Sequence, residues 1–342
     1  MNTSHHSNLS SLPYILLILL LSLANTAAAE SLSAAVLSGD TEAARSLIAD
    51  GADVNQTVGE DRKSLLYIAA RKGHTEIVKL LLDKNADVDA EDELGTRPIW
   101  GSIANNKYAE TLLLLKRGAR VEGNGKVSPL FLASGGGNID IVRALLDAGA
   151  DPNEKLAGTA SALGLAISRG HYGVVRLLLS SGAEPGGPNG DNLHSAVKAG
   201  SVDMVNLLLD HGLDVNQKDS KGATPLLMVI HAPNNGARLV DLLVERGADI
   251  NYEAKKVPPL VALASLKGNV GVLKSALAHN PNLNSNSVKS IYSMIKMGMH
   301  RNANSGEVIK LLKDAGAVGM FEKASHKEEK DTATGLPGWM AE

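Results

Sequence analysis

The sequence predicts an all-α repeat solenoid of about nine stacked units, and two observations support this fold class. A phrase made of a small residue, an acidic residue and an apolar residue recurs nine times between Gly51 and Gly316, at intervals of 30 to 36 residues. The intervals also contain apolar segments with i, i+3, i+4 spacing, such as residues 76–82, which is typical of a helix with one buried face. A period near 33 residues indicates an array in which each unit buries its apolar face against its neighbour.

The nine-fold phrase predicts a turn in every unit. Its clearest copies are residues 50–55, 85–89, 149–153, 212–216 and 247–251, and weaker copies begin at Gly118, Gly182, Asn280 and Gly316. The central Asp of the phrase occurs at most once per unit, in a setting that favours turns. We therefore interpret these residues as turn formers and not as paired catalytic carboxylates.

A second phrase precedes each pair of helical segments and shows where the pair begins. Its best copies are Ser128-Pro129-Leu130-Phe131 and Thr224-Pro225-Leu226-Leu227. A glycine such as Gly73, Gly170 or Gly200 then interrupts the path between the two helices. We predict that the polar residue after each glycine caps the second helix; these residues are His74, His171 and Ser201.

Together these phrases resemble the ankyrin repeat, whose pattern of T-P-L-H, A-A, G-H, V-V, L-L and G-A-D-x-N they follow at the family's period. The resemblance covers roughly residues 31 to 318. It implies L-shaped units of two antiparallel helices and a projecting β-turn or hairpin loop, stacked into a curved solenoid with a concave face. Residues 231–235 add length to the turn of the seventh unit, and the first and last units are atypical, as expected of caps.

The two ends of the chain differ from this body. Residues 14–21 form a short apolar run, and Ala27-Ala28-Ala29 supplies an A-x-A-like site, so we predict a signal peptide over residues 1–29, cleaved after Ala29. No Lys or Arg precedes the run, which keeps an uncleaved membrane anchor open as the alternative. The solenoid is predicted over residues 30–318 and a flexible C-terminal tail over residues 319–342.

The composition restricts the classes of function. The chain has no Cys, which excludes disulfides, thiolate–zinc sites and cysteine nucleophiles. A net charge of −3 and only ten aromatic residues argue against a nucleic-acid partner. A chain exported in this way is expected in the periplasm or outside the cell. A eukaryotic secretory route remains an alternative, and there Asn55-Gln56-Thr57 would be a glycosylation sequon.

The patterns of catalytic and cofactor sites are missing from the sequence. The glycine-rich residues 134–138 are not followed by the Lys-Ser or Lys-Thr of a phosphate-binding loop. The histidines show no metal-ligand spacing, and there is no G-x-S-x-G turn. We therefore predict a protein that is not an enzyme and has no cofactor or metal.

Surface positions give the candidate binding residues. The last position of the second phrase is aromatic in three successive units, at Tyr67, Trp100 and Phe131, where the rings either fill the space between units or anchor a partner. The ankyrin resemblance implies that the position directly after this aromatic one faces the concave side of the array. The position three residues further along the chain faces the same side. This predicts an apolar strip bordered by positive charge, unless its apolar residues pack internally. The candidate partner-binding residues are Ile68, Arg71, Lys72, Trp100, Leu132, Leu165, Arg169, Lys198 and Met228.

These expectations combine into a functional hypothesis. We predict a monomeric, non-catalytic protein-binding scaffold of the periplasm or cell exterior, of the inhibitor, immunity or adaptor type. Its protein partner would present an apolar ridge with acidic flanks to the concave face and the turn tips. The alternatives are a membrane-tethered scaffold, if the signal segment is uncleaved, and an enzyme whose active site is built on the array.

Overall fold

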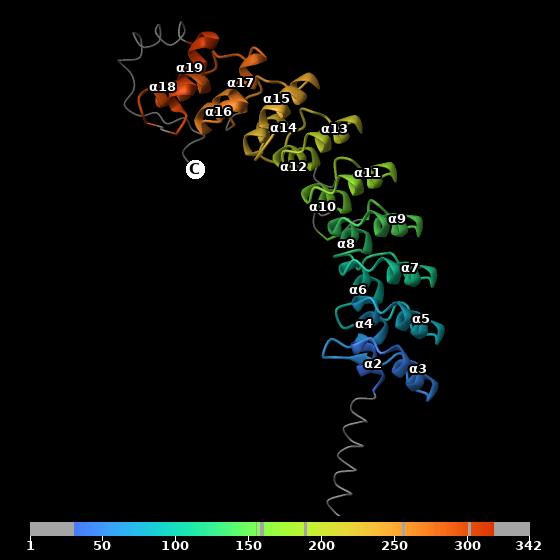
Figure 1. Cartoon of the computed structure of the whole chain (residues 1–342). Helices are drawn as coiled ribbons and strands as arrows, with labels where there is room; N and C mark the ends of the chain where they lie inside the picture. The colour runs from blue at the N-terminus through green and yellow to red at the C-terminus, as the bar shows by residue number, and fades with distance from the viewer. Residues whose placement is uncertain are drawn as a thin grey trace, which may run out of the picture. The chain divides into compact units, whose positions relative to one another are not determined.

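The computed structural model describes residues 31–154, 156–157, 161–187, 190–254, 257–299 and 302–317. The predicted signal peptide and C-terminal tail lie outside these residues. Within the described ranges the backbone forms nine consecutive helix pairs, which confirms the predicted all-α repeat fold (Figure 1). None of the helices in these ranges has the length and apolar character needed to cross a membrane.

The described residues divide into two compact units, of which the first ends at Leu156 and the second begins at Ala157. In the first unit the helices α2, α4, α6 and α8 pack side by side as an inner layer, and α3, α5, α7 and α9 form an outer layer (Figure 1). Their bounds are α2 Leu32–Ser38, α3 Thr41–Ala49, α4 Leu65–Lys72, α5 Thr75–Asp83, α6 Pro98–Ala104, α7 Tyr108–Lys116, α8 Pro129–Gly136 and α9 Ile139–Asp147. A short antiparallel hairpin, β1 Thr57–Val58 and β2 Lys63–Ser64, projects before α4.

The second unit contains five helix pairs of the same kind. Their bounds are α10 Ala162–Ser168, α11 Tyr172–Ser180, α12 Asn192–Lys198, α13 Val202–Asp210, α14 Pro225–Met228, α15 Gly236–Glu245, α16 Leu260–Lys267, α17 Val270–Ala278, α18 Asn286–Lys296 and α19 Ser305–Leu312. The first helix of the seventh pair ends as a 3-10 turn, Val229–His231, where the sequence adds residues. The last pair runs into a π-helical turn, Lys313–Ala317.

The glycines predicted to separate the paired helices have left-handed backbone conformations. Gly73, Gly170 and Gly200 have φ angles of 82°, 74° and 76°, which only glycine adopts without strain. The residue after each glycine is the N-cap of the second helix, as predicted. The prediction that its side chain caps the helix was wrong. The N-cap side chains of His74, His171 and Ser201 make no capping hydrogen bond, whereas Asn138 at the equivalent place accepts from two backbone N–H groups.

The recurring acidic phrase forms the turns between repeats, as the sequence predicts. Asp53 Oδ1 accepts a hydrogen bond from the N–H of Asn55 at 2.9 Å, and Asn55 Oδ1 accepts from the N–H of Asp87 in the next repeat at 2.8 Å. In the second unit Asn216 Oδ1 accepts from the N–H of Asp249 at 2.9 Å. The asparagines therefore join the turns of neighbouring repeats.

Candidate functional site

The predicted contact residues of the first unit divide into exposed and buried groups. Arg71 and Lys72 are exposed in the last turn of α4, and Leu132 is half-buried on α8. By contrast, Ile68 and Trp100 are only 9% and 7% exposed and belong to the core. Those two side chains therefore offer a partner little surface, and the accessible part of the predicted strip in this unit is Arg71, Lys72 and Leu132.

The aromatic residues of the second phrase pack between repeats in this unit. A Cβ atom on Gly101 of α6 would lie 3.0 Å from the ring of Tyr67 and 3.2 Å from the Cβ of Arg71. The absence of a side chain at Gly101 therefore lets the half-buried Tyr67 ring pack closely against the next inner helix. Trp100 is buried and Phe131 is half-buried. For Tyr67 and Trp100 the structure thus supports the packing interpretation over that of a partner anchor.

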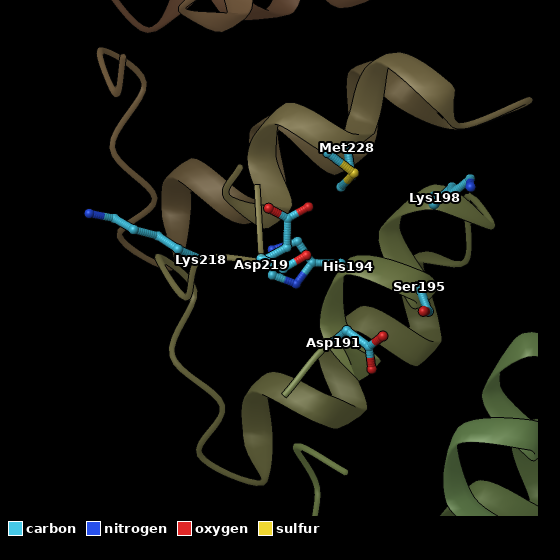
Figure 2. A pocket seen from close by; sticks show the side chains of 8 residues that line it. Asp191, His194, Ser195, Lys198, Lys218, Asp219 and Met228 are labelled. Atoms are coloured by element: carbon cyan, nitrogen blue, oxygen red, sulfur yellow. The ribbon is translucent and has the colours of Figure 1, made fainter. Parts of the chain in front are cut away.

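In the second unit all four predicted residues reach the surface of their inner helices. Leu165 on α10 and Met228 on α14 are half-buried, and Arg169 and Lys198 are exposed. Lys198 and Met228 also border a hollow of about 610 Å³ in this unit (Figure 2). Its lining residues are Asp191, His194, Ser195, Lys198, Lys218, Asp219, Ser220 and Met228.

Asp191, His194 and Asp219 are site members that were not predicted from the sequence. The signal was present, because Asp191-Asn192-Leu193-His194 occupies the place of the T-P-L-H phrase in its repeat. His194 is 6% exposed, and its Nε2 lies 3.0 Å from the carbonyl oxygen of Ala223. Its Nδ1 is buried without a hydrogen-bond partner among the described residues.

Unit one contains a charged cluster at its projecting turns. Lys63 Nζ lies 3.0 Å from Asp61 Oδ2 and 3.1 Å from Asp92 Oδ2. Burial raises the pKa of the Asp92 carboxyl, but hydrogen bonds from Thr96, Lys63 and Leu94 outweigh it, and the net pKa lies below the usual range. The hydrogen bond with Asp61 raises the pKa of the Lys63 ammonium against the opposing effect of burial. Both shifts favour the charged forms of Asp92 and Lys63, whose ion pair ties the two turns together.

One cluster in the second unit contains the residue types of a catalytic triad but not its geometry. Asp241 Oδ1 lies 2.6 Å from Ser275 Oγ and 2.9 Å from His279 Nε2. The hydrogen bond from Ser275 lowers the pKa of Asp241, and His279 adds to this effect. Because serine and histidine both contact the carboxylate, the cluster does not show the serine–histidine pair that would activate a nucleophile. Across the described ranges no group of three His, Asp or Glu side chains could hold a metal ion.

These features define a repeat scaffold with exposed inner-helix residues and projecting turns. A family profile described as "Ankyrin repeats (3 copies)" matches residues 32–124, 103–189 and 187–254. Since these matches cover more than half of the sequence, the chain belongs to the ankyrin repeat family. Ankyrin repeats generally mediate binding between proteins and are generally non-catalytic, so the homologues imply a protein-binding scaffold.

Several known proteins are similar to parts of this chain. Ankyrin repeat and SOCS box protein 3 of Bos taurus is 38% identical over 181 residues, which covers 49% of this chain and 34% of that protein. E3 ubiquitin-protein ligase KEG of Arabidopsis thaliana is 34% identical over 133 residues, covering 34% of this chain and 8% of that protein. The human ASB11 ankyrin repeat domain, a solved structure, aligns with a TM-score of 0.57 and 25% identity, covering 64% of this chain and 98% of that domain. The chain spans 34% or less of the length of the Bos taurus and Arabidopsis thaliana relatives.

Proposed function

We propose that this chain is a non-catalytic scaffold that holds a protein partner against the inner-helix surface of its repeats. The observation that carries the proposal is the exposure of the predicted residues. Seven of the nine candidates, Arg71, Lys72, Leu132, Leu165, Arg169, Lys198 and Met228, are half-buried or exposed on inner helices. We call these seven residues, three in the first unit and four in the second, the inner-helix strip, and each unit presents its own part of it.

The chemistry of the inner-helix strip indicates the kind of partner. Its apolar members, Leu132, Leu165 and Met228, keep enough exposed surface to be desolvated by an apolar ridge on another protein. Its four cations lie in the last turns of α4 and α12 and at the C-cap of α10, and they would attract acidic residues of the partner. We propose a partner of this composition, bound by the monomeric chain.

The proposed location is the periplasm or the cell exterior. The support comes from the apolar run at residues 14–21 and the small residues before Glu30, which match an exported chain cleaved after Ala29. In that compartment a scaffold without catalytic groups would act as an inhibitor, an immunity-type protein or an adaptor. Sequencing the N-terminus of the protein from its native cells should give Glu30, and an intact Met1 in the membrane fraction would favour a tethered scaffold.

Site-specific photo-crosslinking tests the binding surface directly. A photoreactive amino acid at Leu132 or Leu165 should form a defined crosslinked product in native cells. The same amino acid at Lys79, which is exposed on the outer helix α5, is the matched control and should not form this product. If Leu132, Leu165 and Lys79 all gave the same crosslinked product in equal yield, the proposed surface would be contradicted.

A further inference from the structure

Two repeats of this protein build the same turn around an aspartate. Before α6, Asp92 Oδ1 accepts hydrogen bonds from the N–H groups of Leu94 at 2.9 Å and Thr96 at 2.7 Å. Before α14, Asp219 Oδ1 accepts from the N–H groups two and four residues further on, those of Lys221 at 2.9 Å and Ala223 at 2.8 Å. In both turns the aspartate N–H also donates to the carbonyl four residues ahead. Asp92 and Asp219 are therefore structurally equivalent.

The second oxygen of the two aspartates has different surroundings. Asp92 Oδ2 pairs with Lys63, which stands directly before α4's N-cap residue, Ser64, in the preceding repeat. The ammonium of Lys63 also lies 5.4 Å from the centre of the Tyr67 ring. A lysine supplied by the neighbouring turn thus fills the space beside the first aspartate.

The equivalent lysine is absent beside Asp219. The residue directly before the N-cap of α12 is Gly190, and no described residue forms an ion pair or hydrogen bond with Asp219 Oδ2. The place of Tyr67 is taken by His194, three residues after its N-cap. The hollow of about 610 Å³ lies here (Figure 2), within the range of about 300–1,000 Å³ typical of pockets that enclose a ligand.

Two further groups of this hollow lack hydrogen-bond partners among the described residues. His194 is buried, lines the hollow, and its Nδ1 has no partner among the described residues. Asp191 is the N-cap of α12, yet its side chain makes no capping hydrogen bond, so its carboxylate is free to bind elsewhere. An unpartnered buried nitrogen is costly unless a ligand satisfies it.

We propose that this hollow is a binding pocket for a lysine or arginine side chain of the protein partner, whose cation pairs with Asp219 and Asp191. The partner's side chain replaces the lysine that the protein itself provides in the equivalent turn before α6. Met228, at the edge of the hollow, packs against the aliphatic part of such a side chain. This proposal rests on the proposed function, since it assumes a protein partner.

The other charges around the pocket leave this assignment intact. Lys218 places its Nζ 5.0 Å from the centre of the Tyr252 ring, and its side chain points away from Asp219 and His194 in Figure 2. Lys198 lies at the opposite side of the hollow from Asp219, beside Met228 and Ser195 (Figure 2). A metal ion is a poorer occupant, because no three acidic or histidine side chains of the described residues converge closely enough to hold one.

A nuclear magnetic resonance titration of the full chain tests the pocket with a simple probe. The probe is lysine with acetylated and amidated backbone ends, and the neutral control is norleucine capped in the same way. Capped lysine should shift the backbone amides of Lys221 and Ala223 saturably, with a dissociation constant on the order of 1 mM. The equivalent amides of Leu94 and Thr96 are the internal control and should not move, because Lys63 already occupies that turn.

Two variants identify the carboxylates that bind. Asp219→Asn keeps an acceptor for the N–H groups of Lys221 and Ala223 but removes the charge, and we expect binding of capped lysine to weaken about tenfold. Asp191→Asn changes an exposed side chain without a capping bond, so the fold is retained and binding should weaken severalfold. Any of three results would overturn the proposal. Capped norleucine could produce the same chemical shift changes as capped lysine, both variants could bind capped lysine with native affinity, or the amides of Leu94 and Thr96 could respond as those of Lys221 and Ala223 do.

The outcome separates this proposal from the proposed function. Crosslinking through Leu132 and Leu165 does not involve Asp219, so crosslinking without a lysine response leaves the scaffold function in place and rejects the pocket. A lysine response without crosslinking supports the pocket and rejects the Leu132 and Leu165 surface. Failure of both tests rejects both proposals.

Discussion

Replacing Leu81 by Ala should loosen the N-terminal repeats. Leu81 lies on α5 and its side chain is 0% exposed. Removing three side-chain carbons costs about 2.4 kcal/mol at about 0.8 kcal/mol each, and the cavity left behind brings the total to about 2–5 kcal/mol. The principal contacts of α5 are with α3, α4 and α7. The loss of unfolding free energy should therefore be concentrated in the first unit.

Native-state hydrogen exchange measures where this free energy is lost. In Leu81→Ala the amides of α3, α5 and α7 should lose protection, while those of α16 and α17 should keep it. The matched control is Leu80→Ala, which removes the same atoms from a half-buried neighbour on the same helix and should cost less. A uniform loss of protection over residues 31–317 would refute the reasoning, because it would indicate a single cooperative core instead of weakly coupled repeats.

Three further predictions concern charge and surface. The folded pKa of Asp92 is below its unfolded value of about 3.9, so the stability that its ionised form contributes is present above about pH 4 and is lost on further acidification. Urea unfolding at a series of pH values should show that Lys63→Met reduces this acid-induced loss of unfolding free energy. An unchanged pH profile would contradict the pairing of Lys63 with Asp92. His279→Ala should raise the pKa of Asp241, which a carboxyl carbon titration would detect, and no change would show that His279 contributes nothing. Leu132→Asp should change the free energy of unfolding by less than about 1 kcal/mol, because the side chain is half-buried on an inner helix; global unfolding by circular dichroism would place Leu132 in the core.

The repeat architecture could be predicted from sequence because several signals agree within each unit. Gly73 illustrates this: it stands between two apolar segments and adopts the left-handed conformation that ends α4. The turn role of Asp53 and its equivalents also followed from the pattern, since a short acidic side chain can accept from the N–H two residues ahead.

The fine structure of the surface was harder to predict, because burial depends on neighbouring repeats. Ile68 and Trp100 stand at positions assigned to the concave face or to a partner anchor, yet both are core residues. The residue after an inter-helix glycine can be the N-cap without capping, as His74 shows. The hollow beside Asp219 follows a turn that has Gly190 where the equivalent turn has Lys63, and this difference becomes visible only when the two turns are compared.

Association and dissociation rates of the crosslinked partner provide the most direct measurement of the binding surface. The Leu132→Asp, Leu165→Asp double variant should dissociate much faster than the native chain, because it places unpaired charge in a desolvated contact. The Arg71→Glu, Lys72→Glu double variant should associate more slowly, most strongly at low ionic strength, with little change in dissociation. If both variants fold and bind the partner with native rates, the inner-helix strip is not the binding surface.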